Sequence, residues 1–187
     1  AIEAYTSVNA NSLTDHLAFR AMELTFGNLL TAYARGEDLE ARSKMLEGSL
    51  LAGMAFANAG VTAVHAFAYP LGGEFHHIAH GLANSVMLPH VLRFNMLGNI
   101  PKFADISSAF GLLTDDLTDR QAAEEGLEAI EELMIDLNLP LRLRDLNVPE
   151  EAIPGMAQGV IKVTRLLANN PRRITLEDAE RIYRSAW

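Results

Sequence analysis

One stretch of 45 residues, Gly48 to Leu92, carries a single formal charge, at Glu74. The same stretch holds five of the six histidines in the chain: His65, His76, His77, His80 and His90. Charged side chains are almost never fully buried, so a long run without them predicts deeply buried structure. The part from Gly48 to Gly73 is long enough to cross a bilayer, but it is built from Ala and Gly and contains Pro70. We therefore interpret it as protein interior.

The composition limits the function classes. The chain has 187 residues, 49% of them hydrophobic, which suits one domain with a substantial core. It has no cysteine, which excludes disulfides, thiolate-bound metals and a thiol nucleophile. A net charge of −9 argues against nucleic-acid or anionic-membrane partners, because both attract clustered positive charge. No basic stretch followed by an apolar run opens the chain, so we expect no secretory signal and a cytoplasmic protein.

Helical patterns follow one another along the whole chain, and no sustained alternation of apolar and polar residues predicts a strand. Asn11 or Ser12 is a suitable cap for the first long helix, and Thr175 for the last one. The sequence therefore predicts an all-α helical bundle domain. Its predicted helices cover residues 13–35, 38–59, 61–69, 78–95, 119–136 and 149–167, with a last helix after Thr175.

Two local expectations bear on a binding site. The helix from Asp38 is apolar on all sides after Gly48, which predicts that this part is buried. The next helix is expected to break at Pro70. The Gly72-Gly73 pair that follows is expected to make a sharp turn which a ligand can approach closely.

Histidine is almost the only residue type in the uncharged stretch that titrates or binds metal near neutral pH. Each histidine has the alternative of a plain structural role, and spacing alone is a weak metal signal. Glu74 is the one carboxylate nearby, so the stretch by itself gives an incomplete metal site and no di-iron pattern. The chain also lacks the G-x-S-x-G motif of serine hydrolases and the glycine-rich loops that hold nucleotides.

Three segments carry a specific resemblance: Gly60-Val61-Thr62-Ala63-Val64-His65-Ala66-Phe67-Ala68-Tyr69-Pro70-Leu71-Gly72-Gly73, His80-Gly81-Leu82-Ala83-Asn84 and Leu88-Pro89-His90-Val91-Leu92-Arg93-Phe94-Asn95. Together they resemble the iron-dependent (group III) alcohol dehydrogenase family, and the match covers nearly the whole chain. Asn170-Pro171-Arg172 resembles the C-terminal end of the same family. The resemblance implies that residues 1–187 are a single all-α metal-binding domain. An N-terminal α/β domain, which this chain lacks, would bind most of the NAD(P).

The resemblance also implies site residues. His65 and His80 match two histidine ligands of a divalent metal, Fe²⁺ or alternatively Zn²⁺ or Ni²⁺. The other two ligands, from a D-x-x-x-H motif, would lie just before Ala1. Tyr69 and Phe56 match positions near the nicotinamide and along the cleft, although aromatic residues in helices more often serve plain packing. His65 and His80 lie one position farther apart than is usual in the family, which makes His77 the alternative ligand.

The expected function follows from this resemblance. The chain would be the metal-binding half of an NAD(P)-dependent alcohol dehydrogenase that acts on a small alcohol or aldehyde, and it would be inactive alone. We also expect a homo-oligomer, because the face toward a missing nucleotide domain would expose apolar surface. A maleylacetate-reductase-like or dehydroquinate-synthase-like relative remains an alternative, as does a non-enzymatic helical interaction module with structural histidines.

Overall fold

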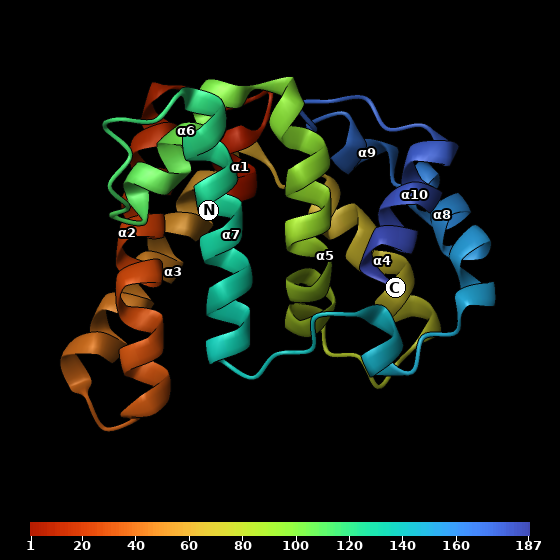
Figure 1. Ribbon diagram of the computed structural model, residues 1–187, viewed down its shortest axis with the longest axis horizontal. Coiled ribbons are helices and arrows are strands. Elements are labelled where there is room, and N and C mark those ends of the chain that lie inside the picture. The colour runs from red at the N-terminus through yellow and green to blue at the C-terminus, as the bar shows by residue number, and fades with distance from the viewer. The chain divides into compact units, whose positions relative to one another are not determined.

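The computed structural model describes residues 1–187 and consists of helices joined by turns, with no strand (Figure 1). This confirms the predicted all-α class. The helices form two compact units. The first unit contains Ala1–Gly60 and Asn99–Ala129, and the second contains Val61–Gly98 and Ile130–Trp187. The expectation of one metal-binding domain over the whole chain stays a prediction.

The first unit contains α1 (Ile2–Thr6), α2 (Ser12–Ala34), α3 (Leu39–Ala59), α6 (Ile100–Ala109) and most of α7 (Asp119–Asp136). The cap residues explain where the two long helices begin. The Asn11 side chain accepts backbone N–H bonds from Leu13 and Thr14, and the Thr14 hydroxyl accepts the Asn11 N–H in return. The Asp38 side chain accepts the N–H of Ala41 at the start of α3. These starts agree with the predicted ones.

A stripe of small residues lets α3 pack closely against α2. Its buried positions are Ala41, Gly48, Ala55 and Ala59. A Cβ atom added to Gly48 would lie 2.7 Å from the Cγ2 methyl of Thr25 on α2, closer than carbon atoms can approach. The two helices therefore approach to a distance that only glycine permits at this point.

The expected burial of the second half of α3 is wrong. Three of its large apolar side chains are exposed: Leu50, Met54 and Phe56. The physical reason is that α3 buries a narrow stripe of small residues against α2 and α1, which leaves these side chains on its other faces exposed. Absence of charge thus did not mean burial on every side.

The second unit contains α4 (Ala63–Glu74), α5 (His80–Asn95), the end of α7, α8 (Ile153–Lys162), α9 (Thr164–Leu167) and α10 (Leu176–Ala186). Three 3₁₀ turns join them, η1 (Met96–Gly98), η2 (Leu143–Leu146) and η3 (Glu150–Ala152). Helix α4 packs against α5, α8 and α9 (Figure 1). At the start of α10, Thr175 and Asp178 form the predicted reciprocal cap.

The expected break at Pro70 and the turn at Gly72-Gly73 are both wrong. Helix α4 continues through all three residues and ends at Glu74. Pro70 packs against Gly159 of α8 so closely that a Cβ atom on Gly159 would lie 2.9 Å from its ring. Pro70 therefore stands inside a helix, where local rules place a helix end, and contacts a segment far along the chain. Gly72 and Gly73 are exposed helical residues with no close neighbour.

The predicted helix over 149–167 is divided into three parts. Pro149 precedes the 3₁₀ turn η3, α8 then runs to Lys162, and Val163 separates α8 from α9.

No single helix in the structure is long and apolar enough to cross a membrane. Helices α3 and α4 reach the required length and composition only when they are counted together across the break between them.

A buried pair of amides connects the start of α4 and the C-terminal end of α5 to the 169–172 segment. Asn95 and Asn170 exchange two hydrogen bonds of 2.8 and 2.7 Å between their side chains. The side-chain oxygen of Asn170 also accepts the backbone N–H of Ala63 at 3.3 Å, and Asn169 donates to the carbonyl of Val61 at 3.0 Å. The residues that open α4 are therefore held by side chains from a distant loop.

Candidate metal centre

His65 lies in the first turn of α4, two residues after the backbone N–H that Asn170 binds. It is half-buried, while its neighbours Val64 and Ala66 are buried. Thr62, which precedes α4, makes no side-chain cap bond. The contacts from Asn169 and Asn170 therefore take the place of a side-chain cap. They fix the position from which the His65 side chain projects.

His80 is the first residue of α5 and is exposed, and a turn over residues 75–79 separates it from α4. His76 and His77 lie in that turn, so neither shares a helix face with His80. The His77 Nε2 atom lies 3.0 Å from the carbonyl oxygen of Leu146, to which it can donate.

The structure brings His65 and His80 together. Their ring centres lie 5.3 Å apart with the ring planes tilted by 59°. Two imidazoles that bind one tetrahedral ion have ring centres roughly 5 Å apart, because each metal–nitrogen bond is about 2.1 Å long and the ring centre lies about 1 Å behind the nitrogen. The observed separation therefore fits two ligands of a shared divalent ion.

Two histidines alone are too few ligands for a stable divalent metal site. No group of three or more His, Asp or Glu side chains in the chain is placed to hold a metal ion. A stable divalent site needs three or four protein ligands, so the pair needs partners from elsewhere.

Tyr69 lies one helical turn after His65 on α4, so their side chains project from the same face of the helix. Its side chain is 44% exposed. Phe56 lies on α3, in the first unit, and is 48% exposed. Both rings are accessible to a ligand, as is that of Tyr33, which is 58% exposed.

His90, on α5, is placed differently from the other histidines of the uncharged stretch. Burial, together with the positive charge of Arg142, lowers its pKa to about 4. The Ser185 hydroxyl, which donates to the Ile182 carbonyl at 2.7 Å, lies 3.2 Å from His90 Nδ1. A neutral imidazole can donate its Nδ1–H to that oxygen, which makes His90 a packing residue near the C-terminal helix.

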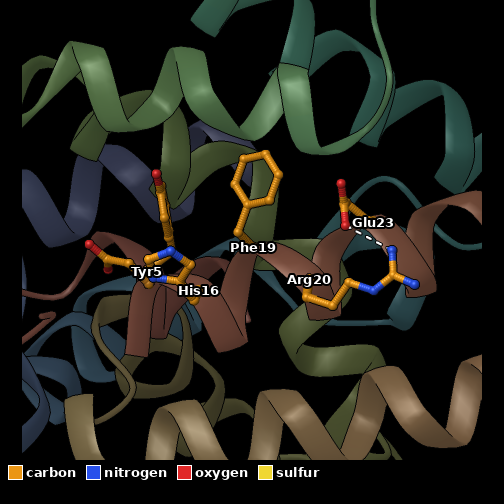
Figure 2. A pocket seen from close by; sticks show the side chains of 6 residues that line it. Tyr5, His16, Phe19, Arg20 and Glu23 are labelled. Atoms are coloured by element: carbon orange, nitrogen blue, oxygen red, sulfur yellow. Dashed lines mark hydrogen bonds and ion pairs between the residues drawn. The ribbon is translucent and has the colours of Figure 1, made fainter. Parts of the chain in front are cut away.

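A separate pocket of about 410 Å³ lies in the first unit, far along the sequence from these histidines. It is lined by residues of α1 and α2: Tyr5, Asp15, His16, Phe19, Arg20 and Glu23. Figure 2 shows Phe19 between the Tyr5–His16 side and the Arg20–Glu23 side, where the two charged groups form an ion pair of 2.9 Å.

The remaining polar groups of this pocket are also paired. The Tyr5 hydroxyl donates to Asp105 at 2.7 Å, and Lys102 donates to Asp15 at 2.7 Å and to the Tyr5 carbonyl at 2.7 Å. Burial and the bond to Asp105 raise the pKa of Tyr5. The hydroxyl therefore stays protonated at neutral pH, and the pocket offers no unpaired set of ligands for a cofactor.

Comparison with known proteins identifies the family. The sequence profile of the "Fe-containing alcohol dehydrogenase family, C-terminal" matches residues 1–187. The chain belongs to the Fe-containing alcohol dehydrogenase family. This confirms the resemblance that the histidine-containing segments indicate.

Individual members of the Fe-containing alcohol dehydrogenase family are similar to this chain in sequence and in structure. It is 44% identical over 187 residues to 1,3-propanediol dehydrogenase of Citrobacter freundii, covering all of this chain and 48% of that protein. It is 41% identical to long-chain-alcohol dehydrogenase 1 of Geobacillus thermodenitrificans, covering 47% of that protein. The crystal structure of a 1,3-propanediol oxidoreductase matches with a TM-score of 0.96 and 43% identity, over all of this chain and 48% of that one. The chain thus spans about half the length of the curated relatives it matches.

Sequence reasoning missed two residues, one that binds the start of α4 and one that contacts His80. Asn170 was noted only as part of a C-terminal motif, although it binds the start of α4. Asn84 was noted only as part of the segment after His80, although its side-chain amide contacts the His80 ring. For Asn84, the four-residue spacing from His80 on a predicted helix was the available signal.

Proposed function

We propose that residues 1–187 form the metal-binding part of an NAD(P)-dependent alcohol dehydrogenase, with His65 and His80 as two ligands of one divalent ion. The carrying observation is the 5.3 Å separation of the two rings, which lie at the ends of different helices and meet across a turn. Family membership supports the reaction class, since the relatives named above are alcohol dehydrogenases. Fe²⁺ is the proposed ion, with Zn²⁺ and Ni²⁺ as alternatives.

The chemistry that a bound divalent ion and a nicotinamide cofactor supply is polarisation of the alcohol oxygen and acceptance of a hydride from the adjacent carbon. His65 and His80 contribute neutral imidazole donors, held at the start of α4 and of α5. Tyr69 lies one turn after His65 and projects from the same face of α4. Phe56 supplies an exposed aromatic surface that suits contact with a nicotinamide ring.

The substrate in this proposal is a small alcohol or the corresponding aldehyde. An Asp and a His supplied by a D-x-x-x-H motif directly before Ala1 complete the ligand set, and an N-terminal α/β domain binds most of the NAD(P). The 187 residues alone bind the ion weakly and have no dehydrogenase activity. A preparation of this chain that oxidised alcohols with NAD would contradict this division of labour.

Metal titration tests the ligand assignment. Co²⁺ is added to the 187-residue chain, and binding is followed by calorimetry and by the visible absorption of the ion. His65→Ala and His80→Ala are each expected to abolish the binding of the parent chain. His16→Ala, at an exposed histidine of the first unit, is the control for casual surface binding and should leave it unchanged. Loss of binding in His77→Ala but not in His80→Ala would transfer the second ligand to His77.

Homo-oligomer formation in the cytoplasm is also part of the proposal. The exposed apolar side chains of α3 support it, because surfaces of this kind often mark interfaces. Leu46 and Leu50 are 73% and 63% exposed. Analytical ultracentrifugation of the chain should show concentration-dependent association, and Leu46→Glu with Leu50→Glu should weaken it. A chain that stays monomeric over a wide concentration range would contradict this part.

A further inference from the structure

Asn84 lies one helical turn after His80 on α5, and its side-chain amide nitrogen makes two contacts with that residue. It donates to the His80 carbonyl oxygen at 2.9 Å. It also lies 3.1 Å from Nε2 and 3.5 Å from Nδ1 of the His80 ring. The carbonyl bond decides which end of the amide faces His80, because the amide oxygen in the same place would meet another acceptor.

The two ring distances show where the amide lies. The hydrogen-bonding directions of Nδ1 and Nε2 diverge in the plane of the ring, so one atom cannot lie along both. An atom nearly equidistant from the two nitrogens, at hydrogen-bonding range, lies over the face of the ring. The amide therefore restricts the tilt of the imidazole while leaving both in-plane nitrogen positions open to other partners.

The other end of the amide supports this interpretation. The Oδ1 atom of Asn84 is buried and has no hydrogen-bond partner. Buried polar atoms are nearly always paired, so an unpaired one calls for an explanation. The explanation here is that the contact of the amide nitrogen with His80 determines the orientation of the side chain.

Two other asparagines show what is particular to Asn84. Asn28 on α2 and Asn58 on α3 make the same bond to the carbonyl four residues back, at 2.7 and 2.8 Å. Neither has a histidine at that position, and neither has an unpaired buried oxygen. The backbone bond is therefore a common helix feature, whereas the ring contact and the unpaired oxygen occur at Asn84.

From these contacts we infer that Asn84 is a positioning residue that holds the His80 imidazole in the orientation for metal binding. The inference rests on the proposed function, since it requires His80 to be a ligand. Groups that orient a metal-binding histidine typically change metal affinity by 10-fold to 100-fold when removed. Asn84 holds the ring by its face rather than through the second nitrogen, so the lower end of that range applies.

The test compares Asn84→Ala with Asn28→Ala in the 187-residue chain, with Co²⁺ as the probe. Both variants remove one side-chain bond to a helix carbonyl, and both residues are half-buried. We expect Asn84→Ala to weaken Co²⁺ binding by about 10-fold and to change the visible bands of the bound ion, and Asn28→Ala to change affinity by less than about 2-fold. Asn84→Leu, which fills the same space without an N–H group, should behave as Asn84→Ala does.

The outcomes separate this inference from the proposed function. If His80→Ala loses Co²⁺ binding but both Asn84 variants bind as the parent chain does, the role of Asn84 is wrong and the metal site stands. If His80→Ala binds Co²⁺ normally, the proposed ligand and the role of Asn84 both fail. A second measurement needs no metal: NMR of the His80 ring should show one ring orientation in the parent chain and averaging in Asn84→Leu. An ordered ring in that variant would also overturn the inference.

Discussion

The α2–α3 pair and the α4–α5 pair are held together by different kinds of contact. Helices α2 and α3 approach through small residues, and at Gly48 the approach leaves no room for a methyl group. Helices α4 and α5 also bury apolar side chains, but the buried amides of Asn95 and Asn170 hold the start of α4 and the C-terminal end of α5. The first arrangement depends on the volume of side chains, and the second depends on hydrogen bonds.

The difference matters for the histidine pair. Buried hydrogen bonds are directional, and leaving one partner unpaired in the interior costs free energy. The start of α4, which carries His65, is thus held by directional bonds, whereas His80 lies at the opposite end of α5 from Asn95.

Asn170→Ala should give the largest effect on stability. It removes two bonds to Asn95 and one to Ala63, and leaves buried groups of both without partners. We expect a loss of about 3 kcal/mol in the free energy of unfolding, measured by urea denaturation. Asn58→Ala, which removes a single exposed bond, is the control and should cost less than about 1 kcal/mol. A loss below that of the control would show that the amide pair is not what holds α4.

The next largest expected effect is the dependence of the free energy of unfolding on pH through His90, in the second unit. Burial, with help from Arg142 and Arg93, lowers the pKa of His90 from 6.5 to about 4. Between these values the unfolded chain binds the proton and the folded chain does not, so the free energy of unfolding falls as the pH decreases. The expected loss is on the order of 2 kcal/mol between pH 7 and pH 4, and His90→Gln should remove this part of the pH dependence.

NMR titration of the His90 ring checks the same prediction directly. The ring should stay neutral well below pH 6. A measured pKa near 6.5 would mean that the interior beside α5 tolerates the charged ring, and would weaken the distinction between the two helix pairs.

Two glycines of α3 test the close packing of the first unit. Gly48→Ala places a methyl group 2.7 Å from Thr25 Cγ2, and the Thr25 hydroxyl is held by its bond to the Ala21 carbonyl. We expect a net loss of about 1 to 2 kcal/mol in thermal or urea unfolding. Gly53→Ala has no atom within 4 Å of the new methyl group, so helix propensity alone should raise stability by up to about 1 kcal/mol. Equal effects of the two changes would mean that α2 and α3 are farther apart than the structure places them.

How far sequence reasoning succeeds also differs between the two pairs. The start of α3 at Asp38 and the cap at Thr175 were predicted correctly, because capping depends on neighbouring residues. The path of α4 through Pro70 was not, because it depends on Gly159, which lies far along the chain. Local patterns carry no information about such contacts.

The candidate site divides in the same way. Resemblance pointed to His65 and His80, and the structure places their rings together, whereas their assignment as metal ligands stays a prediction. Asn170 could not be assigned a role from the sequence, since its partner Asn95 lies 75 positions away. The lack of charge predicted burial of the whole stretch. On α3, however, a side chain is buried or exposed according to the face of the helix on which it lies.

The smallest expected effect concerns the ion pairs beside the pocket of the first unit. Arg20 and Glu23 are 55% and 40% exposed, so Glu23→Gln should change the free energy of unfolding by less than about 0.5 kcal/mol. Asp15→Asn should cost more, about 1 kcal/mol, because Asp15 accepts two bonds from Lys102 and both side chains are less than a third exposed. Urea denaturation of the two variants in low and high salt measures both effects. A larger cost for Glu23→Gln than for Asp15→Asn would mean that the exposed pair within α2 contributes more to stability than the partly buried pair with Lys102.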